Sequence, residues 1–184
     1  MKDMPQASEI IEFWFTPPMS EHWFSSSPEI DNQISSNYES LWDQARQGLL
    51  NEWKNDATGC LALCILLDQF PLNMFRNTLK SFSTEQQAVD ISKHAINKGL
   101  DKKIEEGRVA FLYMPLMHSE HLQDQELCVQ SFANTSLEGN LRFAKHHRDL
   151  IKEFGRFPHR NNILGRESTP AVIDYLQSDR AFTG

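Results

Sequence analysis

The stretch Cys60-Leu61-Ala62-Leu63-Cys64-Ile65-Leu66-Leu67 decides the fold. All eight residues are apolar and only one is β-branched, so the stretch predicts a helix buried on every side rather than a strand. We expect this helix to end before Pro71. Cys60 and Cys64 supply only two of the four ligands that a zinc site requires, so we interpret them as core packing.

Helical patterns extend outward from this stretch in both directions. Ser27-Pro28-Glu29 has the pattern of a helix start, and Ser83-Thr84-Glu85-Gln86 has the spacing of a capping box. Ser119 is placed to cap a further helix, and Thr169-Pro170 begins the last one. We expect helices over 8–15, from 28 to Gly48, from 84 to Gly99, over 109–114 as far as Pro115, from 119 past Phe132, over 141–154 and from 170 past Leu176.

No segment shows the sustained alternation of a strand. The sequence therefore predicts one all-α domain over residues 1–184, with about seven or eight helices joined by short loops. Its 40% apolar content, with only 8 Gly and 8 Pro, excludes a disordered or collagenous chain.

The formal net charge of the 184 residues is −7. We expect no nucleic acid as a partner, because phosphate-backbone binding requires a basic face. We also expect no membrane, since the longest apolar run has eight residues and a bilayer span needs about 20. Three cysteines and an N-terminus without an apolar signal core predict a cytoplasmic protein.

Two loops resemble each other. Asp68 to Arg76 and Gly155 to Arg166 each follow an apolar helix and contain Phe-Pro, then Asn, then Arg. The simpler interpretation is a shared way of ending a helix, with Phe in the core and Pro as the stop. The segment from Arg142 to Arg166 nevertheless carries seven cations and two anions, so the rest of the chain carries −12.

Converging arginines in such a loop match carboxylates and phosphates in bidentate geometry. We expect either an anion pocket or internal ion pairs with the acids of the domain, such as Asp68. His118-Ser119-Glu120-His121 is the second polar feature, but its spacing matches no metal motif and we expect neither a metal nor a cofactor. His147 lies on the apolar face of its helix, where a hydrogen-bonded core histidine is the commoner outcome.

These residues together resemble domain of unknown function family 924, an uncharacterised bacterial family. The resemblance covers nearly the whole chain and includes 11–15, 67–76, 111–120 with Gln125, His147-Arg148 and 154–166. It implies an all-α fold similar to tetratricopeptide-like stacks of helical hairpins, and no established activity. Leu72 stands where the family usually has Arg, which weakens the anion pocket at the first loop, and Glu85 and His121 also depart from its pattern.

Three functions follow as hypotheses. The first is a module that binds a small anionic ligand or a peptide carboxylate between the two Phe-Pro loops, through Gln69, Asn73, Arg76, Gln125, His147, Arg156, Arg160, Asn161 and Arg166. The second is a hydrolase or transferase acting on an anionic substrate, with acid–base candidates His118, Glu120, His159 and Asp68. The third is a purely structural network of arginines and acids.

Overall fold

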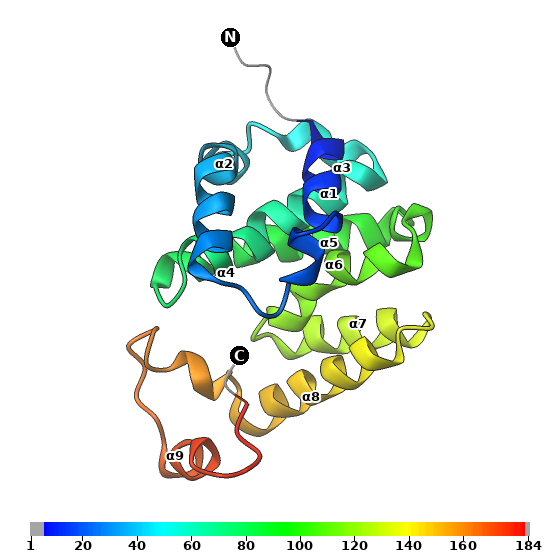
Figure 1. Cartoon of the computed structure of the whole chain (residues 1–184). Helices are drawn as coiled ribbons and strands as arrows, with labels where there is room; N and C mark the ends of the chain where they lie inside the picture. The colour runs from blue at the N-terminus through cyan, green and yellow to red at the C-terminus, as the bar shows by residue number, and fades with distance from the viewer. Residues whose placement is uncertain (1–5, 183–184) are drawn as a thin grey trace.

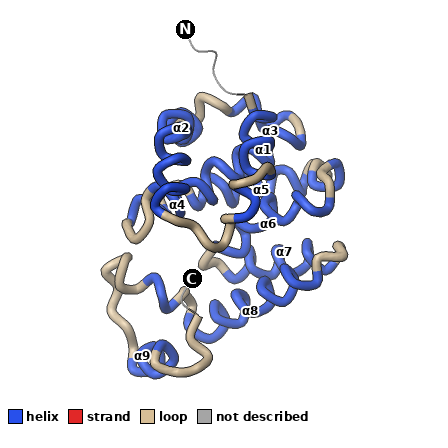
Figure 2. The backbone as a smooth tube through the Cα atoms, viewed as in Figure 1, coloured by secondary structure: helices blue, strands red, loops and turns tan. Residues whose placement is uncertain are grey.

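A computed structural model describes residues 6–182, and this part of the chain contains helices and loops but no strand (Figures 1 and 2). The predicted all-α class is confirmed. The α-helices are α1 Ala7–Phe15, α2 Pro28–Arg46, α3 Ala57–Cys64, α4 Phe70–Met74, α5 Glu85–Asn97, α6 Glu106–His118, α7 Leu122–Ala133, α8 Glu138–Phe154 and α9 Pro170–Leu176. Short 3-10 turns cover Met19–Glu21, Asn51–Asn55, Leu79–Phe82, Asp101–Lys103 and Pro158–Arg160.

The predicted central helix is longer than expected. α3, a π-helical turn over Ile65–Gln69 and α4 run without a break from Ala57 to Met74. The prediction that the helix ends before Pro71 is wrong. Phe70 N–H bonds the carbonyl of Ile65 in the wider π turn. The carbonyl of Leu67, which an N–H at position 71 would bond in a regular α-helix, accepts the Thr84 hydroxyl instead, and this offsets part of the cost of Pro71.

Proline also fails to end α6. The sequence predicts a break at Pro115, but α6 continues through it to His118. Every residue from Val109 to Met117 is buried, and this tertiary packing offsets the cost of the lost backbone hydrogen bond.

Helix starts follow the sequence in part. Ser27 and Thr169 accept hydrogen bonds from the backbone N–H groups of Ile30 and Val172, as predicted. The capping box at Ser83 is wrong, because Thr84 precedes α5 and its hydroxyl donates to the carbonyl of Leu67 at 2.6 Å. The cap at Ser119 is also wrong: α7 begins at Leu122, and the Ser119 hydroxyl donates to Asp124 at 2.7 Å.

The central helix Ala57–Met74 is apolar and long enough to cross a membrane by composition, but 83% of it is buried inside the protein. It packs against α1, α2, α5 and α6, and α5, α6 and α7 each pack on the next helix (Figure 1). This order is compatible with stacked helical hairpins. A smaller apolar cluster of Leu150, Ile151, Phe157 and Tyr175 joins α8 to the C-terminal segment.

All three cysteines are free and buried, as the packing interpretation of Cys60 and Cys64 predicts. Burial raises the pKa of the Cys60 thiol to about 11. This thiol is therefore protonated at neutral pH and packs as a small apolar group.

Candidate functional site

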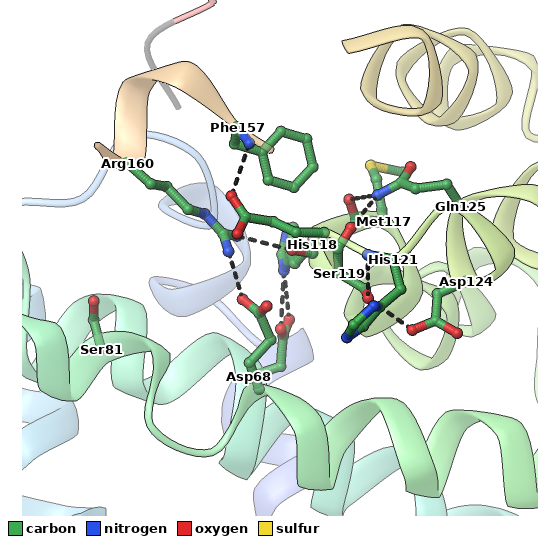
Figure 3. A network of polar contacts seen from close by, with 12 residues as sticks. Asp68, Ser81, Met117, His118, Ser119, His121, Asp124, Gln125, Phe157 and Arg160 are labelled. Atoms are coloured by element: carbon green, nitrogen blue, oxygen red, sulfur yellow. Dashed lines mark hydrogen bonds and ion pairs between the residues drawn. The ribbon is translucent and has the colours of Figure 1, made fainter. Parts of the chain in front are cut away.

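A buried carboxylate and a half-buried imidazole meet between the central helix and the end of α6. Nδ1 of His118 lies 2.9 Å from Oδ1 and 3.0 Å from Oδ2 of Asp68 (Figure 3). The Asp68 side chain is 2% exposed and that of His118 is 21% exposed. The two residues are 50 positions apart in sequence, so the fold alone brings them together.

The π turn positions Asp68 and its neighbour. Gln69 Nε2 donates to Oδ2 of Asp68 at 2.6 Å, so this carboxylate has both a histidine and an amide partner. Single π turns inside α-helices occur frequently at functional sites. Asp68 and Gln69 thus lie in the π turn and not in a regular continuation of α3.

His118 is held in one orientation. Burial lowers the pKa of His118, but the charge of Asp68 and its hydrogen bond raise it by more, so the net shift is upward. Because Asp68 accepts at Nδ1, the neutral ring carries its lone pair on Nε2. Nε2 has no hydrogen bond to a described residue and is not among the fully buried atoms without a partner, so it is at least partly accessible to solvent.

A second ion pair lies beside this histidine. Arg160 Nη1 donates to Oε2 of Glu85 at 2.9 Å, and Arg160 Nη2 donates to the carbonyl of His118 at 3.0 Å. The guanidinium lies 4.4 Å from the ring centre of Phe82 and 4.9 Å from that of Phe157. The Arg160 side chain is 7% exposed, and its Nε is buried without a partner among the described residues.

Burial raises the pKa of Glu85 to about 7, against the opposing charge of Arg160. Glu85 was not predicted from the sequence as a site residue. Its only local signal was its departure from the family pattern at that position, and its partner lies 75 positions away.

Arg166 belongs to a separate network. Its guanidinium donates to both carboxylate oxygens of Glu120, at 2.6 and 2.9 Å, and its Nε donates to Oδ1 of Asn161 at 3.0 Å. Oε1 of Glu120 also accepts from the backbone N–H of Phe157 at 2.7 Å. Burial raises the pKa of Glu120, but the hydrogen bonds from Arg166 and the Phe157 N–H lower it by more. The net shift of the pKa is downward, so the carboxylate is charged at neutral pH. This geometry fits the structural hypothesis for Arg166, Asn161 and Glu120.

Two more histidines lie near Arg160. Burial, together with the charge of Arg160, lowers the pKa of His159 to about 4. Arg160, the next residue along the chain, bonds the carbonyl of His118, so His159 and His118 lie in the same region. Burial also lowers the pKa of His147 to about 4. Nδ1 of His147 bonds the carbonyl of Phe143 at 2.8 Å, in agreement with a hydrogen-bonded core histidine. The Phe182 ring packs on both imidazoles, with ring centres 4.8 and 5.1 Å away.

The remaining predicted ligand residues contact other groups. Asn73 and Arg76 both donate to Asp31, at 2.8 Å, and so fasten α4 to α2. Gln125 donates to the carbonyls of Met117 and Ser119 at 2.7 Å each. Asn73, Arg76 and Gln125 therefore make no hydrogen bond to the second Phe-Pro loop.

Over residues 6–182, no group of three or more His, Cys, Asp or Glu side chains is arranged to hold a metal ion. The candidate site offers the side chains of Asp68, His118, Glu85 and Arg160, which are suited to proton transfer and to recognition of an anion.

Over the described residues, the fold and site define an all-helical protein in which Asp68 of the central helix pairs with His118 at the end of α6. The model of a family described as bacterial protein of unknown function (DUF924) matches residues 10–180, and the chain belongs to this family. The chain is similar to a solved structure of a protein of unknown function from Agrobacterium tumefaciens. The two sequences are 35% identical and the two structures match with a TM-score of 0.86, over 93% of this chain and 96% of the other. No curated protein matches the sequence.

Proposed function

We propose that the protein is an enzyme that uses the Asp68–His118 pair for general acid–base catalysis on a small substrate with an anionic group. The observation that supports this most strongly is the orientation of His118. Its Nδ1 is held by a buried carboxylate, while its Nε2 makes no hydrogen bond to a described residue and is at least partly accessible to solvent. A histidine held in one tautomer by a carboxylate is a recurrent arrangement for proton transfer.

Hydrolysis is the simplest reaction that this pair supports. Nε2 of neutral His118 takes a proton from a water molecule as the water oxygen attacks the carbonyl carbon or the phosphorus of an ester substrate, and Asp68 stabilises the imidazolium that forms. The bond from that carbon or phosphorus to the ester oxygen then breaks, and the imidazolium returns its proton to the leaving oxygen. Because the pKa of His118 is raised, the neutral base form increases as the pH rises toward and above neutrality. We therefore expect the rate to increase from acidic to mildly alkaline pH.

The anionic character of the substrate is inferred from Arg160. Its only carboxylate partner among the described residues is Glu85, whose pKa burial raises to about 7. When Glu85 is protonated, Arg160 loses its one direct ion-pair partner among the described residues. A carboxylate or phosphate group of a substrate would supply a counter-charge.

Arg156 is the second cation available for such a group. It lies in the same loop as Arg160 and makes no ion pair with a described residue, whereas Arg166 is already engaged by Glu120. We place this activity in the cytoplasm, where free cysteines such as those of this chain persist.

The test measures release of 4-nitrophenolate from 4-nitrophenyl phosphate and from the 4-nitrophenyl half-ester of succinate, both of which carry an anionic group. His118→Asn should reduce the rate at least about 100-fold, and Asp68→Asn should also reduce it, because each removes part of the acid–base pair. The matched control is His121→Asn, since His121 is exposed and lies three residues along the chain. No release above buffer, or equal rates in the His118 and His121 variants, contradicts the proposal.

A further inference from the structure

The backbone that carries His118 is held by side chains from other parts of the fold. α6 ends at His118 without a glycine, and the next residue, Ser119, has an extended backbone. The last four carbonyl groups of an α-helix have no partner inside the helix, and a glycine in the left-handed conformation often helps to satisfy them. At this helix end the partners must therefore come from elsewhere.

Gln125 supplies two of these hydrogen bonds. Its Nε2 donates to the carbonyl of Met117 and to the carbonyl of Ser119, at 2.7 Å each (Figure 3). The carbonyl between them, that of His118, accepts from Nη2 of Arg160 at 3.0 Å. Three successive carbonyl groups centred on His118 are thus bound by one residue of α7 and one residue of the second Phe-Pro loop.

The Gln125 amide makes its hydrogen bonds to this segment. Gln125 is 0% exposed, and its Nε2 faces two carbonyl oxygens, which can only accept, so both of its N–H groups are used. Its Oε1 is buried without a hydrogen-bond partner among the described residues, which is unfavourable. The bonds to the carbonyls of residues 117 and 119 are therefore what a glutamine gains at this position.

The contact between His118 and Asp68 is sensitive to where this segment lies. Nδ1 is 2.9 and 3.0 Å from the two carboxylate oxygens, so a displacement of about 1 Å away from them would break the hydrogen bond. Asp68 is held separately, by Gln69 in the π turn of the central helix. Different elements thus hold the two members of the pair, and the distance between them depends on both.

We propose that Gln125 is a positioning residue for His118: it fixes the backbone from which the imidazole reaches Asp68. The importance of Gln125 for catalysis rests on the proposed function, but its effect on the ring does not. Gln125 carries no charge, so replacing it leaves in place the charges that act on His118, those of Asp68, Arg160 and Glu85. A changed titration of the ring would then report a changed geometry.

The experiment follows the ring nitrogens of His118 by NMR in the full-length wild type, in Gln125→Met and in Gln125→Asn. Methionine has a similar shape but no N–H donor, and asparagine keeps the amide but is too short to reach both carbonyls. In both variants the pKa of His118 should fall toward its value in Asp68→Asn, because the contact with the carboxylate loosens. A share of the neutral rings should also carry the proton on Nε2 instead of Nδ1.

Phe132→Leu is the matched control, because Phe132 is also buried and lies two turns further along α7. It should lower the melting temperature without changing the titration or the tautomer of His118. Hydrolysis of the two 4-nitrophenyl substrates is the second readout: kcat should fall about tenfold in the Gln125 variants with KM unchanged, since a displaced base affects the chemical step.

An unchanged titration and tautomer of His118 in both Gln125 variants, an equal change in Phe132→Leu, or an unchanged kcat in an active enzyme would overturn the proposal. Absence of hydrolysis in the wild type would instead contradict the proposed function. The NMR result then decides the role of Gln125 by itself.

Discussion

Arg166 donates to Glu120 through both of its Nη atoms, while Glu120 accepts the backbone N–H of Phe157 through one of the same carboxylate oxygens. One carboxylate therefore fixes both ends of the second Phe-Pro loop. The sequence left open whether this loop forms an anion pocket or internal ion pairs, and at Arg166 it forms internal ion pairs.

Arg166→Ala tests this network. Removing a bidentate partner of a half-buried carboxylate should lower the free energy of unfolding by about 2 kcal/mol. It should also accelerate hydrogen exchange of the Phe157 amide, because the Glu120 acceptor loses its position. Urea unfolding and NMR exchange rates measure the two effects.

Arg156→Ala is the matched control, since Arg156 lies in the same loop without an ion pair to a described residue. Its effect should remain within about 0.5 kcal/mol, as for most surface substitutions. Equal losses in both variants would show that the Glu120 contact has no special role.

Glu85 predicts a pH dependence of stability. Burial raises its pKa from 4.5 to about 7, so the folded protein holds this proton more tightly than the unfolded chain does. The stability that Glu85 contributes is thus complete below about pH 4.5 and is lost as the pH rises through about 7.

The free energy of unfolding of the wild type, relative to Glu85→Gln, should therefore fall by about 2 to 3 kcal/mol between pH 5 and pH 8. Glu12→Gln, at an exposed acid of α1, should show a constant difference over this range. Urea unfolding at both pH values gives the result, and a difference that is flat or that rises with pH for Glu85→Gln would refute the shifted pKa.

Gly59 tests the packing of the central helix. A Cβ atom at this position would overlap the carbonyl oxygen of Trp53, which belongs to the preceding turn rather than to a flexible side chain. Gly59→Ala should therefore cost more than about 3 kcal/mol or prevent folding, as expected for overpacking against a fixed backbone.

Gly139→Ala is the counterpart in α8. A Cβ there has no atom within 4 Å, so the substitution should stabilise the protein by about 0.5 to 1 kcal/mol through helix propensity. Thermal unfolding compares the two. A tolerated Gly59→Ala would mean that the Asn51–Asn55 turn does not lie against α3 as described.

The sequence predicts most of this fold because each helix buries one apolar face, and composition alone identifies Cys60 to Leu67 as the centre. It fails at Pro71 and Pro115. There the local rule that proline ends a helix is overcome by a π turn and by burial, neither of which periodicity reveals.

The sequence identified which residues could belong to the candidate site, but not which of them pair with each other. Asp68, His118 and Arg160 stand out in the sequence, but their pairing spans 50 and 42 positions and depends on how α6 packs against the central helix. Asn73 and Arg76 resemble their counterparts in the second loop, yet they bind Asp31 because α2 lies beside α4. Similar local sequences thus reach different partners.

The pH titration of the His118 ring by NMR, in the wild type and in Asp68→Asn, tests the central claim most directly. In the wild type, the pKa of His118 should lie above its ordinary value of 6.5, because Asp68 stabilises the charged ring against burial. In Asp68→Asn it should fall below that value, since burial and Arg160, which lower the pKa, are then opposed only by the weaker effect of Glu85. An identical titration in both proteins would contradict an acid–base pair at Asp68 and His118.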